Sequence, residues 1–150
     1  MIIDYKTLME EAVLFLEKEK SIVLATSADD KVTARTVSHV NDGINIYFQT
    51  GNTSEKFMQI KTNPLIALAV GNMQIEAAAE ALGHPSANPR FIGLYKIKFP
   101  RYYELYTCSE DEAVIKAIPI KITFYKYIDG KPCKDILDLK SQKAYRERCD

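Results

Sequence analysis

Short apolar segments separated by turn signals are the feature of this 150-residue sequence that most constrains its fold. In residues 32–40, one face carries Val32, Ala34 and Thr36 and the other carries Thr33 and Arg35. Alternation with a period of two is typical of a β-strand with one face turned to the core. Similar or fully apolar segments follow turn signals elsewhere, which predicts further strands at 22–26, 44–49, 65–70, 73–82 and 119–128.

Turns and helices fit between these strands. Asn41-Asp42-Gly43 favours a tight turn because glycine accepts a positive φ without steric cost. Apolar residues at steps of three and four predict an amphipathic helix over 5–20 with Asp4 or Thr7 near its start. A second helix is expected up to about Thr62, with Asn52 as its N-cap and Glu55 as the capping-box partner.

The rest of the chain carries weaker patterns. Residues 84–106 hold three prolines and a cluster of tyrosines, so short helices and loops are expected there. The basic run at 140–148 is interpreted as a solvated helix or tail. The first three strands are expected to form a meander. Six or seven strands with few helices predict a mainly β (α+β) domain, either an antiparallel barrel or a sandwich, spanning 1–150 without a second domain.

Composition narrows the function. Twenty Lys and Arg balance twenty Asp and Glu, so no overall field attracts a polyanion, and nucleic-acid binding is disfavoured. The sequence has no apolar run near the ~20 residues that a membrane helix needs. The first residues lack the basic flank and apolar stretch of a signal peptide, so we expect a cytoplasmic protein that binds no membrane.

Cysteine and histidine content argues against a metal site. The three cysteines, Cys108, Cys133 and Cys149, lack metal-ligand spacing, and the two histidines, His39 and His84, lie far from them in sequence. We therefore expect free thiols and no metal.

The segment from Thr50 to Lys56 is the strongest candidate site. A helix start leaves unpaired N–H groups at the positive end of the helix dipole, which suits an anion. Ser54 adds a hydroxyl and Lys56 an ammonium group, a set that could hold a phosphate monoester. The alternative is an ordinary capped helix with a solvated lysine.

Arg35 strengthens the anion-site interpretation, because a guanidinium in the middle of a strand is costly unless it meets an anion or a ligand. An arginine facing solvent on an open sheet is the alternative. Gln74 could hydrogen-bond a ligand amide or could be an ordinary surface residue. The tyrosines could stack on a flat ring or simply pack, at positions Tyr95, Tyr102, Tyr103 and Tyr106. Glycine-rich nucleotide motifs and a nucleophile elbow are absent from the sequence.

Four ordered motifs together resemble the pyridoxamine 5'-phosphate oxidase-like family of flavin-binding split barrels. The resemblance covers about residues 21–71 and consists of Ala34-Arg35-Thr36-Val37, Ile46-Tyr47-Phe48-Gln49-Thr50, Ser54-Glu55-Lys56 and Asn63-Pro64. It implies a six-stranded antiparallel Greek-key split β-barrel with peripheral helices. It also implies a homodimer with FMN at the subunit interface.

The same resemblance assigns cofactor-binding roles to residues of this chain. Arg35 would lie at the polar edge of the flavin or near its phosphate, Thr36 and Val37 would touch the ring through their backbone, and Gln49 and Thr50 would border the ribityl chain. Ser54 and Lys56 would bind the phosphate, and Gln74 resembles a glutamine that approaches the ring.

Departures from the family pattern shape the functional expectation. Glu55 stands where true pyridoxamine phosphate oxidases have arginine, Val40 stands where a lysine is expected, and the chain has no tryptophan. We therefore expect an FMN-dependent oxidoreductase that is not a true pyridoxamine phosphate oxidase, with no side chain that is an obvious acid or base. Its small-molecule substrate or electron acceptor is not named by the sequence. The alternatives are a non-catalytic flavin-binding or stress-linked module, and a flavin-free barrel that binds haem, another ligand or a protein.

Overall fold

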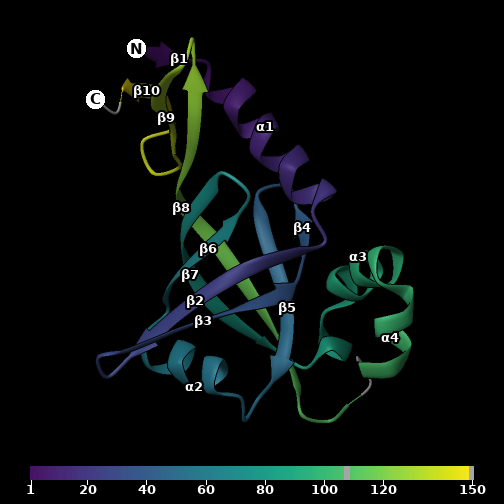
Figure 1. The fold of residues 1–150 in the computed structure, drawn as a ribbon. Coiled ribbons are helices and arrows are strands. Elements are labelled where there is room, and N and C mark those ends of the chain that lie inside the picture. Colours follow the sequence, from purple (N-terminus) through teal and green to yellow (C-terminus); the bar gives the residue numbers. More distant parts are fainter. Residues whose placement is uncertain (107–108, 149–150) are drawn as a thin grey trace.

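The computed structural model describes residues 1–106 and 109–148. Its core is an antiparallel sheet of six strands in the order β3–β2–β6–β7–β8–β5 (Figure 1). Within the described residues, β3 and β5 do not pair with each other, so the barrel is split between them. Because β5 returns to lie beside β8, the order is a Greek key, as predicted. These strands are β2 (Ser21–Ala28), β3 (Lys31–Ser38), β5 (Asn45–Gly51), β6 (Leu65–Val70), β7 (Met73–Gly83) and β8 (Glu112–Ile128).

The sheet continues beyond the barrel. The second half of β8 pairs with β9 (Lys131–Asp138), which pairs with β10 (Lys143–Arg148), and β1 (Ile2–Ile3) adds to the edge. The predicted solvated helix or tail at 140–148 is therefore wrong. Arg146 explains the difference, because it donates to the buried Asp135 at 2.6 and 2.9 Å and so fixes the basic segment against the strand β9 opposite it.

The first helix, α1 (Tyr5–Lys18), confirms its prediction. Asp4 caps it by accepting a hydrogen bond from the Thr7 backbone N–H at 2.9 Å. The helix buries one face, formed by Leu8, Ala12 and Leu16, and packs against β4 (Val40–Asp42), β9 and β10. Its apolar stripe thereby joins the core inside the barrel.

The predicted meander is only half right. β2 and β3 form the expected hairpin, with Asp29 and Asp30 at positive φ in its turn. The chain then bends at the buried His39, whose N–H donates to the Lys20 carbonyl at 3.3 Å, and continues as β4. β4 pairs with β5, and β5 takes β8 as its other neighbour.

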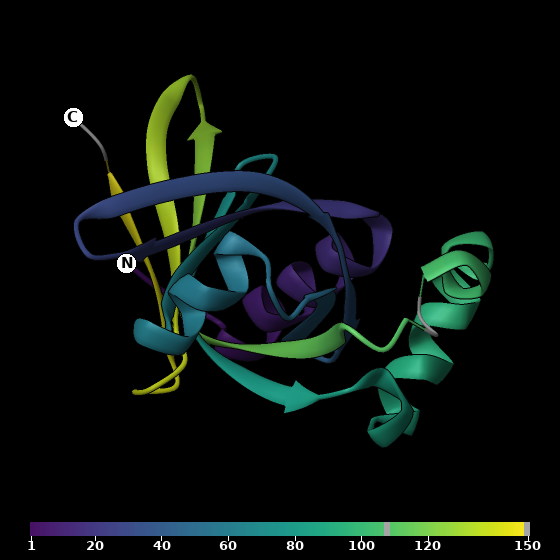
Figure 2. The ribbon, with the colours of Figure 1, turned by 90° about the horizontal axis from the view of Figure 1, so that it is seen from below.

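Two groups of helices flank the barrel (Figure 2). One is α2 (Glu55–Thr62), which lies across the lower end of the barrel and contacts β2. The other is an insertion between β7 and β8 that stands to one side of the barrel, composed of the 3-10 helix Pro85–Ala87 with α3 (Pro89–Lys98) and α4 (Pro100–Tyr106). This confirms the short helices expected at 84–106. Across the described ranges, no helix combines the length and the apolar character that crossing a bilayer requires.

Candidate functional site

A pocket with a volume of 510 Å³ opens where β3, β5 and the start of α2 meet the α3–α4 insertion. This volume is in the range of small-molecule sites. Five residues proposed from sequence line the pocket, namely Thr36, Val37, Gln49, Thr50 and Lys56. The structure thus gathers most of the predicted set at one place.

Ser54 builds the turn that leads into α2. Its hydroxyl accepts a hydrogen bond from the Phe57 N–H at 3.3 Å and lies 2.9 Å from the Thr50 hydroxyl. Ser54 is therefore the N-cap, and the assignment of Asn52 to that role is wrong. The Asn52 N–H instead donates to the Asp111 carbonyl at 2.7 Å, which ties the turn to the segment before β8.

Lys56 supplies the positive charge of the pocket. It is half-buried, and this burial lowers the pKa of its ammonium group, with the charge of Arg35 acting in the same direction and that of Glu112 against it. No ion pair to Lys56 occurs within residues 1–106 and 109–148. A partly desolvated cation beside the positive end of a helix is suited to an anionic ligand.

Gln49 shows that the pocket lining has an unused hydrogen-bond acceptor. Its Oε1 atom is buried and has no hydrogen-bond partner among the described residues, although the side chain lines the pocket. A buried acceptor without a donor is costly, so a ligand hydroxyl or N–H would satisfy it. Together with the hydroxyls of Thr50 and Ser54 and the ammonium of Lys56, this set suits a ligand that carries both hydroxyl groups and a phosphate.

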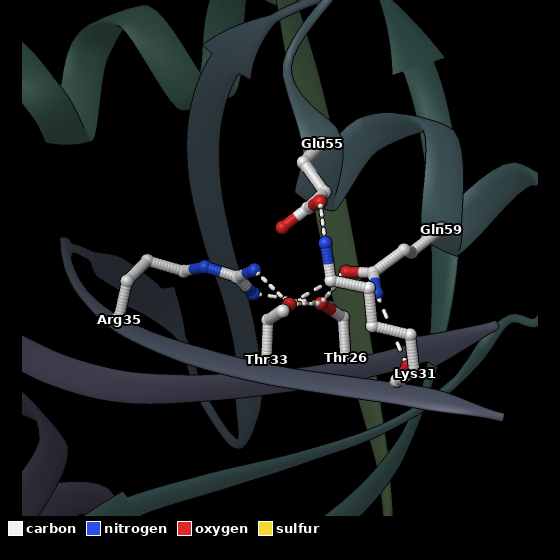
Figure 3. A network of polar contacts seen from close by, with 6 residues as sticks. All are labelled: Thr26, Lys31, Thr33, Arg35, Glu55 and Gln59. Atoms are coloured by element: carbon white, nitrogen blue, oxygen red, sulfur yellow. Dashed lines mark hydrogen bonds and ion pairs between the residues drawn. The ribbon is translucent and has the colours of Figure 1, made fainter.

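Arg35 does not line the pocket. It belongs instead to a polar network with Thr26, Thr33 and Gln59 (Figure 3). Its guanidinium donates to the Thr26 hydroxyl at 2.7 Å and to the Thr33 hydroxyl. Both hydroxyls in turn donate to Gln59 Oε1 of α2, at 2.6 and 2.7 Å. Arg35 is thus neither fully solvated nor without partners in the core, because it belongs to a polar network that joins β2, β3 and α2.

Glu55 does not cap the helix that it begins. Its carboxylate forms an ion pair with the Lys31 ammonium at 2.6 Å. That contact holds the pKa of Glu55 below its usual range, first through the hydrogen bond from Lys31 and then through its charge. The expected capping-box role of Glu55 is therefore wrong, since an oppositely charged partner on β3 lies within reach.

Gln74 and Thr36 lie on the same, outer face of the sheet, at opposite ends of one row of residues. The register aligns Thr36 with Val23, Val23 with Ala69 and Ala69 with Gln74, so the four residues form one row across β3, β2, β6 and β7. At the usual strand spacing this row separates Gln74 from Thr36 by about 14 Å. Gln74 does not line the pocket within this chain.

The α3–α4 insertion and β8 contribute pocket residues that sequence reasoning missed or left open. Tyr95 and Tyr102 line the pocket, and Tyr95 also stacks on Phe91 in the second core cluster, with ring centroids 5.2 Å apart. Glu112 lines it as well, because β8 places it opposite Gly51. No local pattern marks Glu112, since the pairing joins residues far apart in sequence. The Tyr106 side chain lies outside the described part.

Histidines and cysteines contribute little to the site. His39 is buried, with Nε2 3.0 Å from the Leu16 carbonyl, and burial lowers its pKa to about 4. The His84 ring lies with Nδ1 2.8 Å from the Ser86 hydroxyl and Nε2 2.9 Å from the Ser109 carbonyl. Cys133 is a free, buried thiol, whereas Cys108 and Cys149 lie outside the described residues. The described ranges contain no group of three or more His, Cys, Asp and Glu side chains that could hold a metal ion.

The sequence of this chain matches one known protein family. A family model described as pyridoxamine 5'-phosphate oxidase matches residues 8–126. The chain belongs to the pyridoxamine 5'-phosphate oxidase family. The match includes β2 to α2, which hold the candidate anion site, and extends through all but the last two residues of β8.

Solved structures support the family fold. General stress protein 26 from Bacillus anthracis is 22% identical, with 88% of this chain and 98% of that chain covered and a TM-score of 0.67. ChuZ from Campylobacter jejuni is 16% identical over 95% of this chain and 63% of that chain, with a TM-score of 0.75. A FAD-binding protein from Mesorhizobium loti is 10% identical over 75% and 90%, with a TM-score of 0.61. Curated protein sequences give no match.

Proposed function

We propose that this member of the pyridoxamine 5'-phosphate oxidase family binds FMN in the pocket between β3, β5 and α2, and acts as an oxidoreductase on a small molecule. The observation that carries the proposal is the convergence of Lys56, Thr50 and Ser54 at the start of α2, beside Oε1 of Gln49, which has no hydrogen-bond partner among the described residues. When bound, FMN would supply the hydride-transfer chemistry.

Different residues would bind different parts of the ligand. Lys56, Ser54 and the first turn of α2 would hold the phosphate, with Arg35 as a second positive charge nearby. Thr50 and Gln49 would bind the ribityl hydroxyls, and Thr36 and Val37 would border the ring. Val40 and the absence of tryptophan favour a substrate other than pyridoxamine phosphate.

A second copy of the chain would complete the site. The outer face of the barrel exposes large apolar side chains, with Val32 74% and Leu65 61% accessible. Contiguous exposed apolar surface often marks a protein–protein interface. We call this face the outer apolar patch, consisting of Val23, Val32, Leu65 and Ala69. It includes two members of the row between Thr36 and Gln74, so pairing through it would bring Gln74 of one subunit toward the pocket of the other.

Ligand titration tests the phosphate assignment. Calorimetric titration of wild-type protein with FMN and with riboflavin, which lacks the phosphate, should show tighter binding of FMN. Lys56→Ala should weaken FMN binding about 10- to 100-fold, the value of one charge-assisted hydrogen bond, and leave riboflavin binding nearly unchanged. Lys61→Ala on the same helix is the matched control. Equal FMN affinity in Lys56→Ala and wild type would reject the assignment.

Oxidoreductase activity needs its own measurement. Reduction of the bound flavin by NADH or NADPH, followed by transfer to an added acceptor, would support an enzyme. A yellow protein that binds FMN without turnover would instead identify a flavin-binding module.

A further inference from the structure

The acidic residue in the Ser54-Glu55-Lys56 turn poses an electrostatic problem for the proposed phosphate site. A carboxylate in the first turn of α2 would repel a phosphate dianion bound at the same helix start. About half of the Glu55 side chain is solvent-exposed, so burial does not neutralise it. The site needs another source of compensation.

Lys31 supplies that compensation from the first position of β3. Its ammonium lies 2.6 Å from Glu55 Oε2. The backbone of Lys31 is also tied to the helix, because its carbonyl accepts a hydrogen bond from Gln59 Nε2 at 3.3 Å. The strand and the helix are therefore joined twice, once by charge and once through the backbone (Figure 3).

Gln59 also orders the arginine of the network. Each hydroxyl group has a single proton, and those of Thr26 and Thr33 are both given to the Gln59 carbonyl oxygen. Their lone pairs are thereby free to accept from the two terminal nitrogens of Arg35. Gln59 is buried, so its amide has a fixed position in the folded protein.

We propose that Lys31 and Gln59 are positioning residues of the phosphate site, Lys31 by neutralising Glu55 and Gln59 by fixing Arg35 as the second cation beside Lys56. This inference rests on the proposed function. The five residues Lys31, Arg35, Glu55, Gln59 and Lys56 form what we call the phosphate clamp. Its defining property is that it acts on the charge of the ligand's phosphate, and not on the flavin ring.

A series of charge-removing variants tests the role of Lys31. FMN and riboflavin are titrated at low ionic strength, because salt screens an exposed ion pair. Lys31→Met should weaken FMN binding about fivefold, as expected for an uncompensated charge several ångströms from a dianion, and leave riboflavin binding unchanged. Adding Glu55→Gln to Lys31→Met should restore the FMN affinity. Lys61→Met is the matched control for loss of a lysine elsewhere.

The rescue separates a charge effect from damage to the fold, since a merely structural role for Lys31 would not be repaired by removing its partner. Gln59→Met is expected to lower the ratio of FMN to riboflavin affinity, which is measured within one folded variant and does not depend on its Tm. Three results would overturn the inference and leave the phosphate site itself standing. They are an FMN affinity in Lys31→Met equal to that of wild type, an FMN affinity that the double variant does not recover, and an FMN-to-riboflavin ratio that Gln59→Met leaves unchanged. If wild-type protein prefers riboflavin or binds neither ligand, the proposed function fails and the clamp fails with it.

Discussion

Glu112 is the residue that most complicates the charge balance of the pocket. Burial raises the pKa of its carboxyl, with Lys56 and His84 acting to lower it and Asp111 acting with burial. It also acts electrostatically on Tyr95 across the pocket. No hydrogen bond or ion pair of this side chain occurs in the part of the chain that the structure describes. An ionised Glu112 therefore opposes an anion near Lys56.

Removing this charge should strengthen FMN binding. Glu112→Gln is expected to bind FMN about threefold to tenfold more tightly than wild type at a pH above the raised pKa of the carboxyl. As pH falls through the raised pKa, the wild-type carboxyl takes up a proton and the difference between the two proteins should shrink. Comparing them at each pH cancels the titration of the ligand's own phosphate. A difference that stays constant or grows toward low pH would contradict this role.

At the scale of elements, the β6–β7 turn and α1 meet at a glycine. Gly71 has a φ of +55°, and a Cβ atom there would lie 2.7 Å from the Phe15 ring of α1. Gly43 has a similar φ of +60° but nothing within 4 Å of its Cβ position. The pair therefore separates backbone strain from a steric clash between a turn and a helix.

Gly71→Ala should destabilise the protein more than Gly43→Ala. The left-handed backbone alone costs an alanine about 1 kcal/mol, and displacement of Phe15 should add about 1–3 kcal/mol at Gly71. Urea unfolding with an unchanged m-value measures both free energies. Equal losses at the two positions would show that α1 yields freely to the new methyl group.

At the scale of the whole molecule, the outer apolar patch is the proposed dimer interface. We expect wild-type protein to elute in light-scattering chromatography at twice its chain mass of 17.0 kDa. Leu65→Glu should shift it toward the monomer, because a charge within an apolar interface is desolvated without a partner. Leu14→Glu on α1, where the native residue is 64% exposed, is the control. A wild-type monomer at micromolar concentration would reject the dimer.

Local patterns predicted the elements whose signals lie within one segment. The amphipathic stripe of α1, a start at Asp4 or Thr7 and the apolar strand β6 were predicted, with a small error only at the end of α1. The cap of α2 was placed two residues early. Asn52 and Ser54 have similar capping ability, and the contact between Ser54 and Thr50 from β5 is what distinguishes them.

Long-range pairing determined what local patterns could not predict. The strand β10 exists because the polar segment from Lys143 to Arg148 pairs with β9 and because Arg146 meets Asp135. Glu112 enters the pocket through its register opposite Gly51, and Lys31 meets Glu55 through the β2–β3 hairpin. Each of these contacts joins segments that carry no shared periodicity.

The sequence by itself determined the strand-rich class, the hydroxyl- and lysine-bearing turn of the candidate site and the resemblance to its family, because alternation, caps and turn residues act over a few neighbouring positions. Only the tertiary structure decided which charges face one another. Strand register and helix placement bring Lys31 to Glu55, Arg35 to two threonines, and Glu112 near Lys56. Electrostatic interactions depend on distance in space, and the folded chain alone sets that distance.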